Sequence, residues 1–107
     1  MPTIKQNMVS INSQKIYDLL KLIPKGRVTT YKELADKVKS KAYRGVGQIV
    51  GANPDAPKVP CHRVVKSDGG ISGYAFGVDK KIALLKSEGI EVKNDKVVDF
   101  EKKFYPL

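Results

Sequence analysis

Apolar residues recur at helical spacing in three stretches of this chain, and polar residues fill the positions between them. In residues 13–23 the apolar positions are Ile16, Leu19, Leu20 and Ile23. In residues 30–38 they are Tyr31, Leu34, Ala35 and Val38. In residues 78–89 they are Ile82, Leu84 and Leu85. Each stretch is therefore predicted to form an amphipathic helix with these side chains turned inward.

Local signals mark the ends of these helices. Pro24 and Gly26 stop the first, and the segment PKGRVTT that contains them predicts a turn followed by a short extended piece. Thr30 followed three residues later by Glu33 is a capping box, in which the hydroxyl and the carboxylate satisfy backbone N–H groups at the helix start. Gly89 closes the helix of residues 78–89.

A glycine-rich stretch, YRGVGQIVGANP at residues 43–54, also predicts a helix. Gly45, Gly47 and Gly51 each weaken it by roughly 1 kcal/mol relative to alanine. Such a helix makes sense where its surface must lie close against something flat. The tight turn KSKA joins it to the helix before it, so the two form a helix-turn-helix candidate.

The rest of the chain predicts short extended pieces and turns. KVPCHRVV is followed by KSDGGISGY, whose Asp68-Gly69-Gly70 predicts the tip of a hairpin. We find no internal repeat, low-complexity segment or linker. We therefore expect one domain over residues 1–107, mainly α-helical and built around the helix-turn-helix, with a short β-hairpin-like wing after Val65.

The charge of the chain favours nucleic acid as its partner. Twenty lysines and arginines against eleven acidic residues give a formal net charge of +9. The excess lies mainly in residues 1–60, which carry 11 basic and 4 acidic residues. No basic amphipathic face stands out, so a polyanion is favoured over a membrane surface. The plain alternative is a lysine-rich solubilising surface, as in heat-adapted proteins.

The composition argues against several other classes of protein. No apolar run approaches the roughly 20 residues that span a bilayer, and the start lacks an apolar core of signal-peptide length. One cysteine forms no internal disulfide, which suits the cytoplasm, or the nucleus in a eukaryote. One cysteine and one histidine make no four-ligand zinc site without carboxylates, so we expect no metal and no cofactor.

That one cysteine and that one histidine stand side by side in PCHRVV, residues 60–65. A free thiol has a pKa near 8.5, so a nucleophilic Cys61 needs a base or positive surroundings, and His62 and Arg63 offer both. Neighbours in a helix point about 100° apart, so contact between Cys61 and His62 requires a turn or a bridging water. The competing interpretation is a small buried cysteine beside an ordinary histidine.

PCHRVV, with GANP before it and GGISGYAFG and KIALLKSEG after it, closely resembles the O6-alkylguanine-DNA alkyltransferases, also called methylated-DNA–protein-cysteine methyltransferases. The resemblance runs from about Tyr17 to Gly89. It implies DNA repair by direct damage reversal. A monomeric protein would bind double-stranded DNA bearing O6-alkylguanine and move the alkyl group irreversibly to its own cysteine, once per molecule.

The resemblance also implies roles in the chemistry. Cys61 is the alkyl acceptor, and His62 deprotonates it through a bridging water. Glu88 hydrogen-bonds the imidazole and orients it. Asn53 braces the turn that carries the site, and Tyr31 donates its hydroxyl toward the purine leaving group. Because Tyr31 also lies on the inward stripe of its helix, a core aromatic remains an alternative for this residue.

The same resemblance implies how DNA is bound. The glycine-rich helix enters the minor groove, the target base is flipped out, and Arg44 fills the vacated stack. A phosphate contact or a solvated side chain is the alternative for Arg44. The expected DNA-binding residues are Tyr43, Arg44, Gly45, Gly47, Gln48, Ala52 and Arg63. The expected base pocket consists of Tyr31, Val65, Tyr74, Ala75 and Phe76.

Two departures from the family pattern affect these expectations. The common two-domain form has an extra N-terminal domain, and this chain has room for almost none of it. Its absence should leave the chemistry intact but bears on stability and damage preference. Phe76 is bulky where many members carry a small residue, which predicts a tighter pocket that accepts methyl more readily than benzyl-sized adducts.

Other functions remain as alternatives. Alkyltransferase-like proteins of nearly this length bind alkylated guanine without transferring the group and recruit other repair machinery. They typically carry tryptophan or another residue in place of the acceptor cysteine, whereas this chain has Cys61 and no tryptophan. A sequence-reading transcription factor is disfavoured by the glycines and the lack of a side-chain-rich recognition face. A cysteine hydrolase is weaker still, since nothing indicates an oxyanion hole.

Overall fold

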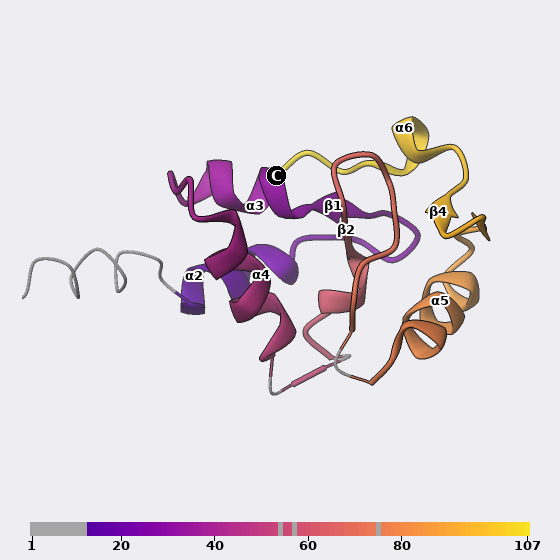
Figure 1. The fold of residues 1–107 in the computed structure, drawn as a ribbon, viewed down its shortest axis with the longest axis horizontal. Helices are drawn as coiled ribbons and strands as arrows, with labels where there is room; N and C mark the ends of the chain where they lie inside the picture. The colour runs from indigo at the N-terminus through magenta and orange to yellow at the C-terminus, as the bar shows by residue number, and fades with distance from the viewer. Residues whose placement is uncertain (1–12, 54, 57, 75) are drawn as a thin grey trace, which may run out of the picture.

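Three helices lie together in the N-terminal half of the chain (Figure 1). They belong to a computed structural model that describes residues 13–53, 55, 56, 58–74 and 76–107. The helices are α2 (Ser13–Leu20), α3 (Tyr31–Lys37) and α4 (Tyr43–Gly51). Helix α4 packs against both others, and α3 with α4 forms the predicted helix-turn-helix. Their buried side chains include Ile16, Leu20, Leu34, Ala35, Val46 and Val50.

The start of α3 confirms half of the predicted capping box. The hydroxyl of Thr30 accepts a hydrogen bond of 3.1 Å from the backbone N–H of Glu33. The carboxylate of Glu33 does not return to the helix start as predicted. It accepts a bond of 2.7 Å from the backbone N–H of Leu107, because the end of the chain lies against α3. A hydrogen bond between residues 74 positions apart thus replaces the predicted bond of Glu33 to the helix start.

A pair of short parallel strands connects the helices to the cysteine segment. Strand β1 (Thr29–Thr30) pairs with β2 (Val64–Val65), with Thr29 opposite Val64 and Thr30 opposite Val65. The 3₁₀ turn η1 (Cys61–Arg63) leads directly into β2. All four strand residues are buried. The cysteine segment is therefore tied by backbone hydrogen bonds to the strand that precedes α3.

The turn predicted at Asp68-Gly69-Gly70 is present, but it is not the tip of a two-stranded hairpin. The N–H of Lys66 donates to the carbonyl of Gly70 at 2.9 Å, while Gly70 forms an antiparallel bridge with Lys96. The antiparallel hairpin lies later, between β3 (Val92–Lys93) and β4 (Lys96–Val97). Tertiary pairing explains the difference, since the turn bonds to β4: the N–H of Val97 donates to the carbonyl of Gly69 at 2.9 Å.

Helix α5 (Val78–Ser87) buries a different set of residues from the predicted one. Leu85 is buried as expected, but Ile82 and Leu84 are only half-buried. The other buried side chain of α5 is Lys81, which has no exposed surface. Gly89 follows the helix with φ +86°, as its closing role predicts. The tail ends in α6 (Phe100–Lys103) and a short extended segment.

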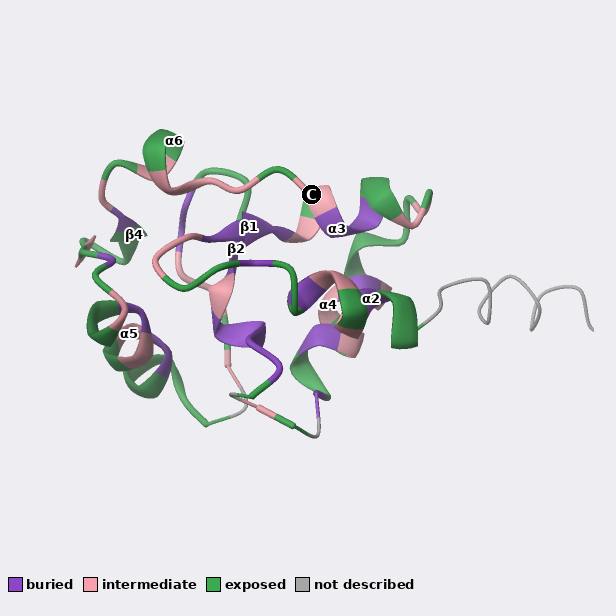
Figure 2. Ribbon diagram, turned by 180° about the vertical axis from the view of Figure 1, so that it is seen from behind, coloured by how far each residue is buried: buried purple, intermediate pink, exposed green. Residues whose placement is uncertain are grey.

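The buried residues form two hydrophobic clusters, and the cysteine lies in the first. Figure 2 shows buried segments along the strands and on the inward sides of the helices. The first cluster joins Cys61 to side chains of α2, α3 and α4. The second joins Val28, Val65, Leu85, Ile90 and Val97. Among the described residues, no helix has the length and apolar character needed to cross a membrane.

Candidate active site and DNA interface

Cys61 is the first residue of η1, and it is only 4% exposed. Its backbone N–H donates to the carbonyl of Val59 at 2.8 Å, and Arg63 N–H donates to the carbonyl of Pro60 at 3.0 Å. These bonds make a tight turn that ends in β2. The thiol is consequently held by backbone structure on both sides, within the first hydrophobic cluster.

Asn53 braces the loop that leads to this turn. Its side-chain Nδ2 donates to the carbonyl of Val59 at 2.6 Å. Its Oδ1 accepts from the backbone N–H of Asp55 at 3.0 Å. One buried amide therefore fastens both the end of the α4 segment and the residue two positions before Cys61.

His62 is buried beside Cys61 and is paired with a carboxylate. Its Nε2 lies 3.0 Å from Oε2 of Glu88, at the end of α5. An ionised carboxylate only accepts hydrogen bonds, so Nε2 carries the proton and Nδ1 of the neutral ring carries a free lone pair. Nδ1 is buried and makes no hydrogen bond within the described part of the chain. This geometry leaves His62 with one unused basic nitrogen.

The ionisation states of His62 and Glu88 would allow His62 to act as a base. Burial lowers the pKa of His62 below its ordinary value, and the hydrogen bond and charge of Glu88 offset this only in part. Burial alone would raise the pKa of Glu88, but hydrogen bonds from Arg63 and His62 outweigh it and hold that pKa below normal. Near neutral pH the pair is therefore a carboxylate and a neutral imidazole.

Arg63 does not occupy the DNA-binding position that the sequence suggested. Its guanidinium binds Glu88 through two bonds, from Nε to Oε1 at 2.9 Å and from Nη2 to Oε2 at 2.6 Å. Nη1 donates to the carbonyl of Ile23 at 2.8 Å, and the side chain is 15% exposed. Because its donors point inward, Arg63 positions Glu88 and joins η1 to the end of the α2 segment.

Tyr31 opens α3 and is the centre of a second polar group. Its hydroxyl lies 2.6 Å from Oγ of Ser72. Oγ of Ser72 also accepts a bond of 3.0 Å from Nζ of Lys81, which donates to the carbonyl of Val64 at 2.7 Å as well. Burial raises the pKa of Tyr31, although the bond to Ser72 opposes the rise. The phenol is therefore protonated near neutral pH.

The residues expected to line the base pocket differ in their exposure. Tyr74 is half-buried, and its hydroxyl is buried without a hydrogen bond to any described residue. Phe76 is 61% exposed, with its ring edge-on to Tyr74 at 5.6 Å. Val65, in β2, is fully buried in the second cluster, so it is a core residue and not a pocket wall. Ala75 lies outside the described residues.

Helix α4 presents a polar, small-residue face. Positions 44, 47, 48 and 51 follow the helical repeat, and none of them is buried. A Cβ added at Gly47 or at Gly51 would meet no atom within 4 Å. The packing of this domain therefore does not require either glycine. Gly45 is half-buried, and Ala52 at the end of the helix is exposed.

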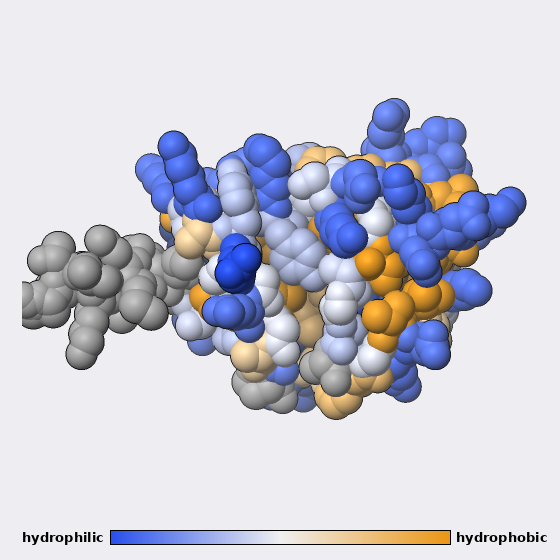
Figure 3. All heavy atoms as spheres, in the orientation of Figure 1, coloured by the Kyte–Doolittle hydropathy of each residue, from blue (hydrophilic) through white to orange (hydrophobic). Residues whose placement is uncertain are grey.

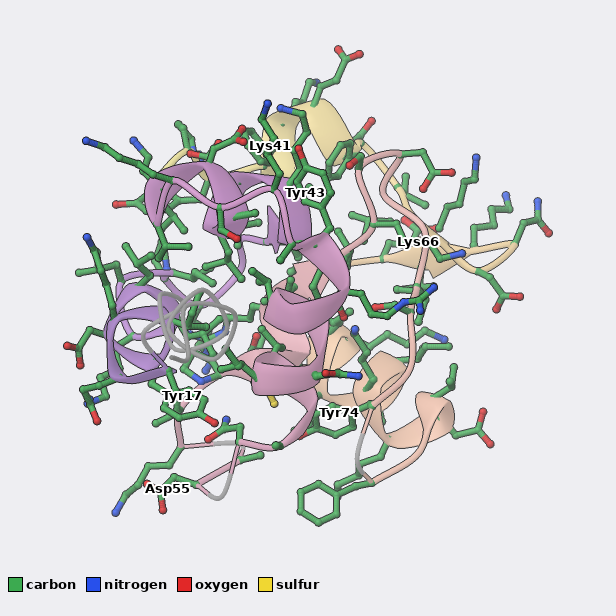
Figure 4. The ribbon with its side chains drawn as sticks, turned by 60° about the vertical axis from the view of Figure 1, so that its left-hand side comes forward. Tyr17, Lys41, Tyr43, Asp55, Lys66 and Tyr74 are labelled. Atoms are coloured by element: carbon green, nitrogen blue, oxygen red, sulfur yellow. The ribbon has the colours of Figure 1, made fainter. Side chains whose placement is uncertain are left out.

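Basic and aromatic side chains surround the start of this helix. Figure 4 shows Lys41 and Tyr43 at the N-terminal end of α4 and Lys66 on the loop after β2. Tyr43 is 46% exposed, and Arg44 beside it is also exposed. In Figure 3, hydrophilic side chains project along the upper edge of this side of the molecule, while hydrophobic ones gather over α5. Lys41 and Arg44 therefore place two exposed positive charges at the start of α4.

Two polar residues at the site, Ser72 and Lys81, are not predicted from the sequence. A serine in a glycine-rich loop and a lysine in a lysine-rich helix carry no local signal of burial. The one available hint was the spacing of Lys81, which lies four residues before Leu85 and so on the same side of α5. Among the described residues, no group of three or more potential metal ligands is present.

A helix-turn-helix with an open glycine-bearing face, joined to a buried cysteine and a histidine–carboxylate pair, is the arrangement of a small DNA-binding domain. The chain belongs to the family described as 6-O-methylguanine DNA methyltransferase, DNA binding domain, whose model matches residues 12–90.

Relatives with the same segment support this membership. A methylated-DNA–protein-cysteine methyltransferase of Candida glabrata is 47% identical over 83 residues, which are 77% of this chain and 40% of that protein. A bifunctional methyltransferase/endonuclease of Picrophilus torridus is 42% identical over 83 residues, 77% of this chain and 28% of that protein. The chain thus spans less than half the length of these two curated relatives.

Solved structures show the same fold. The Mycobacterium tuberculosis OGT in complex with DNA has a TM-score of 0.68 and 42% identity, over 71% of this chain and 48% of that one. S. pombe Atl1 in complex with damaged DNA containing O6-carboxymethylguanine has a TM-score of 0.76 and 29% identity, over 87% of this chain and 93% of that one.

Proposed function

We propose that this protein binds double-stranded DNA bearing O6-alkylguanine and transfers the alkyl group irreversibly to Cys61. The observation that carries the proposal is the environment of the thiol. Cys61 adjoins a buried, neutral His62 whose Nε2 is bound to Glu88 and whose Nδ1 is unused. Homologous structures bound to DNA support the class of partner.

The transfer follows from these groups. His62 Nδ1 takes the thiol proton through one bridging water, and the negative charge of Glu88 stabilises the imidazolium that forms. The thiolate attacks the sp³ carbon of the adduct. The bond from that carbon to O6 breaks, and its electron pair leaves with the guanine. Tyr31 supplies a proton to the departing purine, and the product is a thioether on Cys61.

DNA binding belongs to α4 in this proposal. The open surface at Gly47 and Gly51 lets the backbone of the helix approach the minor groove closely. Arg44 enters the stack vacated by the flipped base, whose extrusion costs a few kcal/mol. Tyr43, Gly45, Gln48 and Ala52 lie on or beside the same surface. Phosphate contacts supply most of the affinity, so binding is sensitive to salt and nearly independent of sequence.

Phe76 and Tyr74 form the lip of the base pocket in this proposal. Their rings meet edge-on at 5.6 Å, and Phe76 projects into solvent. A bulky ring at the lip narrows the space beside the adduct. The expected result is faster transfer of methyl than of benzyl, measured as single-turnover rates on the two adducts. Equal rates for methyl and benzyl transfer would show that Phe76 does not restrict the size of the adduct.

A second function, lesion binding without transfer, is favoured by one observation. The likeness to S. pombe Atl1 bound to DNA extends over nearly the whole of both chains, 98% of each in one structure, with a TM-score of 0.73 and 28% identity. The presence of Cys61 beside the His62–Glu88 pair favours transfer over this alternative.

Intact-protein mass after incubation with a duplex containing O6-methylguanine tests the proposal. We expect a gain of one methylene that saturates at one per molecule and is absent in Cys61→Ala and with an undamaged duplex. If the mass stays constant while both proteins bind the damaged duplex selectively in a gel-shift assay, the function is lesion binding. If neither transfer nor selective binding occurs, both functions are excluded.

A further inference from the structure

The buried lysine of α5 is an unusual feature of the site. Lys81 has no exposed surface, and no carboxylate of the described residues pairs with it. Its Nζ instead donates to the carbonyl of Val64 at 2.7 Å and to Oγ of Ser72 at 3.0 Å, with the carbonyl of Gly73 at 3.5 Å. A buried ammonium is tolerated when its protons have acceptors, and these three oxygens provide them.

Lys81 determines the direction of the hydrogen bonds around Ser72. A lysine ammonium has donors only, so Ser72 Oγ is the acceptor of the bond from Lys81. The proton of Ser72 remains free to donate, and the phenolic oxygen of Tyr31 lies 2.6 Å away. When Ser72 donates to this oxygen, the proton of Tyr31 is released for an acceptor outside the network. The distance is at the short end for hydroxyl pairs, as expected in a chain polarised by a cation.

We propose that Ser72 is a positioning residue for the alkyl transfer, which holds the oxygen of Tyr31 and turns the proton of Tyr31 toward the departing base. This inference rests on the proposed function. During transfer the carbon–O6 bond breaks as the carbon–sulfur bond forms, and the proton of Tyr31 passes to the purine. The phenolate left behind accepts the hydrogen bond of Ser72, which the charge of Lys81 strengthens. The proton that His62 took from the thiol then reaches Tyr31 through water, which restores the neutral imidazole and the neutral phenol.

The competing role for Ser72 is purely structural. It links the loop of residues 66–77 to α3 and to α5, so its loss could loosen the site as a whole. Such loosening would slow every reaction of Cys61. A positioning role acts through Tyr31 alone, so the two roles differ in which reactions they change.

The first experiment measures alkyl transfer in a double-mutant cycle of Ser72→Ala and Tyr31→Phe. A hydrogen bond to a developing charge is worth enough to slow transfer by about tenfold or more when Ser72→Ala is made alone. In the Tyr31→Phe background the same substitution should change the rate by no more than about twofold. Ser72→Thr should restore most of the rate, and Ser67→Ala, in the same loop, should have no effect. Equal losses in both backgrounds would overturn the proposal.

The second experiment uses iodoacetamide, whose iodide leaves without a proton. Cys61 of Ser72→Ala should react with this reagent at the wild-type rate, because no acid is needed. A parallel loss of both reactions would show that Ser72 acts on the thiol or on the fold, which would overturn the proposal. Titration of the tyrosine absorbance without DNA adds an independent readout. The Ser72→Ala substitution should raise the pKa of Tyr31, since the bond from Ser72 opposes the effect of burial.

Alkyl transfer by the wild-type protein distinguishes a failure of the proposed function from a failure of the inference about Ser72. If it takes no alkyl group from DNA, the proposed function fails and the role of Ser72 in transfer fails with it. If the wild type transfers the group and the cycle shows no coupling between Ser72 and Tyr31, only the inference about Ser72 is overturned.

Discussion

At the scale of single residues, the site is organised by one carboxylate. Glu88 accepts one hydrogen bond from Nε2 of His62 and two from Arg63. It therefore sets the tautomer of His62 and holds η1 against α5. Glu88 lies 26 residues after His62 and 25 residues after Arg63 in the sequence. Removing the charge of Glu88 should therefore affect both the base and the packing of Arg63.

The substitution Glu88→Gln should slow alkyl transfer about 100-fold, the lower end of what a general base contributes. The neutral amide leaves His62 a weaker base and leaves the imidazolium unpaired. Single-turnover rates measured by intact mass would show this, at a temperature where circular dichroism confirms folding. Glu91→Gln, an exposed acid a few residues away, is the matched control. Equal rates for both variants would contradict the role of Glu88.

Lys81 makes the stability of the fold depend on pH. Burial lowers its pKa from 10.5 to about 8, with the charge of Cys61 acting in the opposite direction. Between about pH 8 and 10 the unfolded chain keeps a proton that the folded chain has lost. The free energy of unfolding should therefore rise with pH in this window, by up to about 1.4 kcal/mol per pH unit.

Urea unfolding at pH 7.5, 8.5 and 9.5 measures this rise. The Cys61→Ala background is preferred because it removes the charge of Cys61 that acts on Lys81. Lys81→Met should abolish the rise, whereas Lys80→Met, an exposed neighbour in the same helix, should keep it. A stability curve with the same slope in both variants would show that another group titrates.

At the scale of elements, α4 has one face that packs in the core and another face that is proposed to bind DNA. Val46 and Val50 are buried in the first cluster, while the open glycines lie on another face of the helix. A helix that only packed would gain stability from alanine at these positions. Open glycines on this face therefore fit the proposed close approach of DNA.

Gly47→Ala tests this separation. The free protein should become more stable by about 0.5–1 kcal/mol, because the new methyl group meets open space and alanine favours the helix. Affinity for the damaged duplex should fall by about tenfold, because the methyl group would hold the helix away from the groove. Thermal unfolding and gel-shift titration measure the two effects. Ala83→Gly in α5 is the control, with lower stability and unchanged affinity. Unchanged affinity in Gly47→Ala would move the DNA contact away from this face.

At the scale of the whole molecule, the thiol is part of the core. Cys61 lies in the same cluster as side chains from α2, α3 and α4, so a change at its sulfur reaches the packing of all three helices. Strand β2 joins the two clusters, since Val64 belongs to the first and Val65 to the second. In the proposed reaction, alkylation of Cys61 and the stability of the fold are consequently linked.

The alkylated protein should therefore be less stable than the free protein. An extra methyl group on a buried sulfur overfills a packed site by about 1–3 kcal/mol. For a domain near this size, each kcal/mol lowers the melting temperature by roughly 4–8 °C. Calorimetry before and after complete reaction would show the decrease, and Cys61→Ala treated identically would show none. An unchanged melting temperature would mean that space for the methyl group already exists beside the thiol.

The sequence determined the features that depend on neighbours in the chain. Helical spacing predicted α2, α3 and α5, and the glycine-rich stretch predicted α4. Thr30 and Gly89 marked helix ends because capping and left-handed backbone are local properties. PCHRVV and its flanking motifs identified the family. Each of these signals depends on a few neighbouring residues, so it can be interpreted without knowing which distant residues it will contact.

Only the tertiary structure decided which polar groups meet. Arg63 turned inward to Glu88, Glu33 bound the backbone of Leu107, and Lys81 became the buried residue of α5. A charged or hydroxyl side chain can be satisfied by water or by many partners, so its sequence position does not reveal its partner. The network from Lys81 through Ser72 to Tyr31 exists because β2, the following loop and α5 converge on the start of α3. These groups lie together because distant segments pack against one another, and local conformational preferences do not determine their positions.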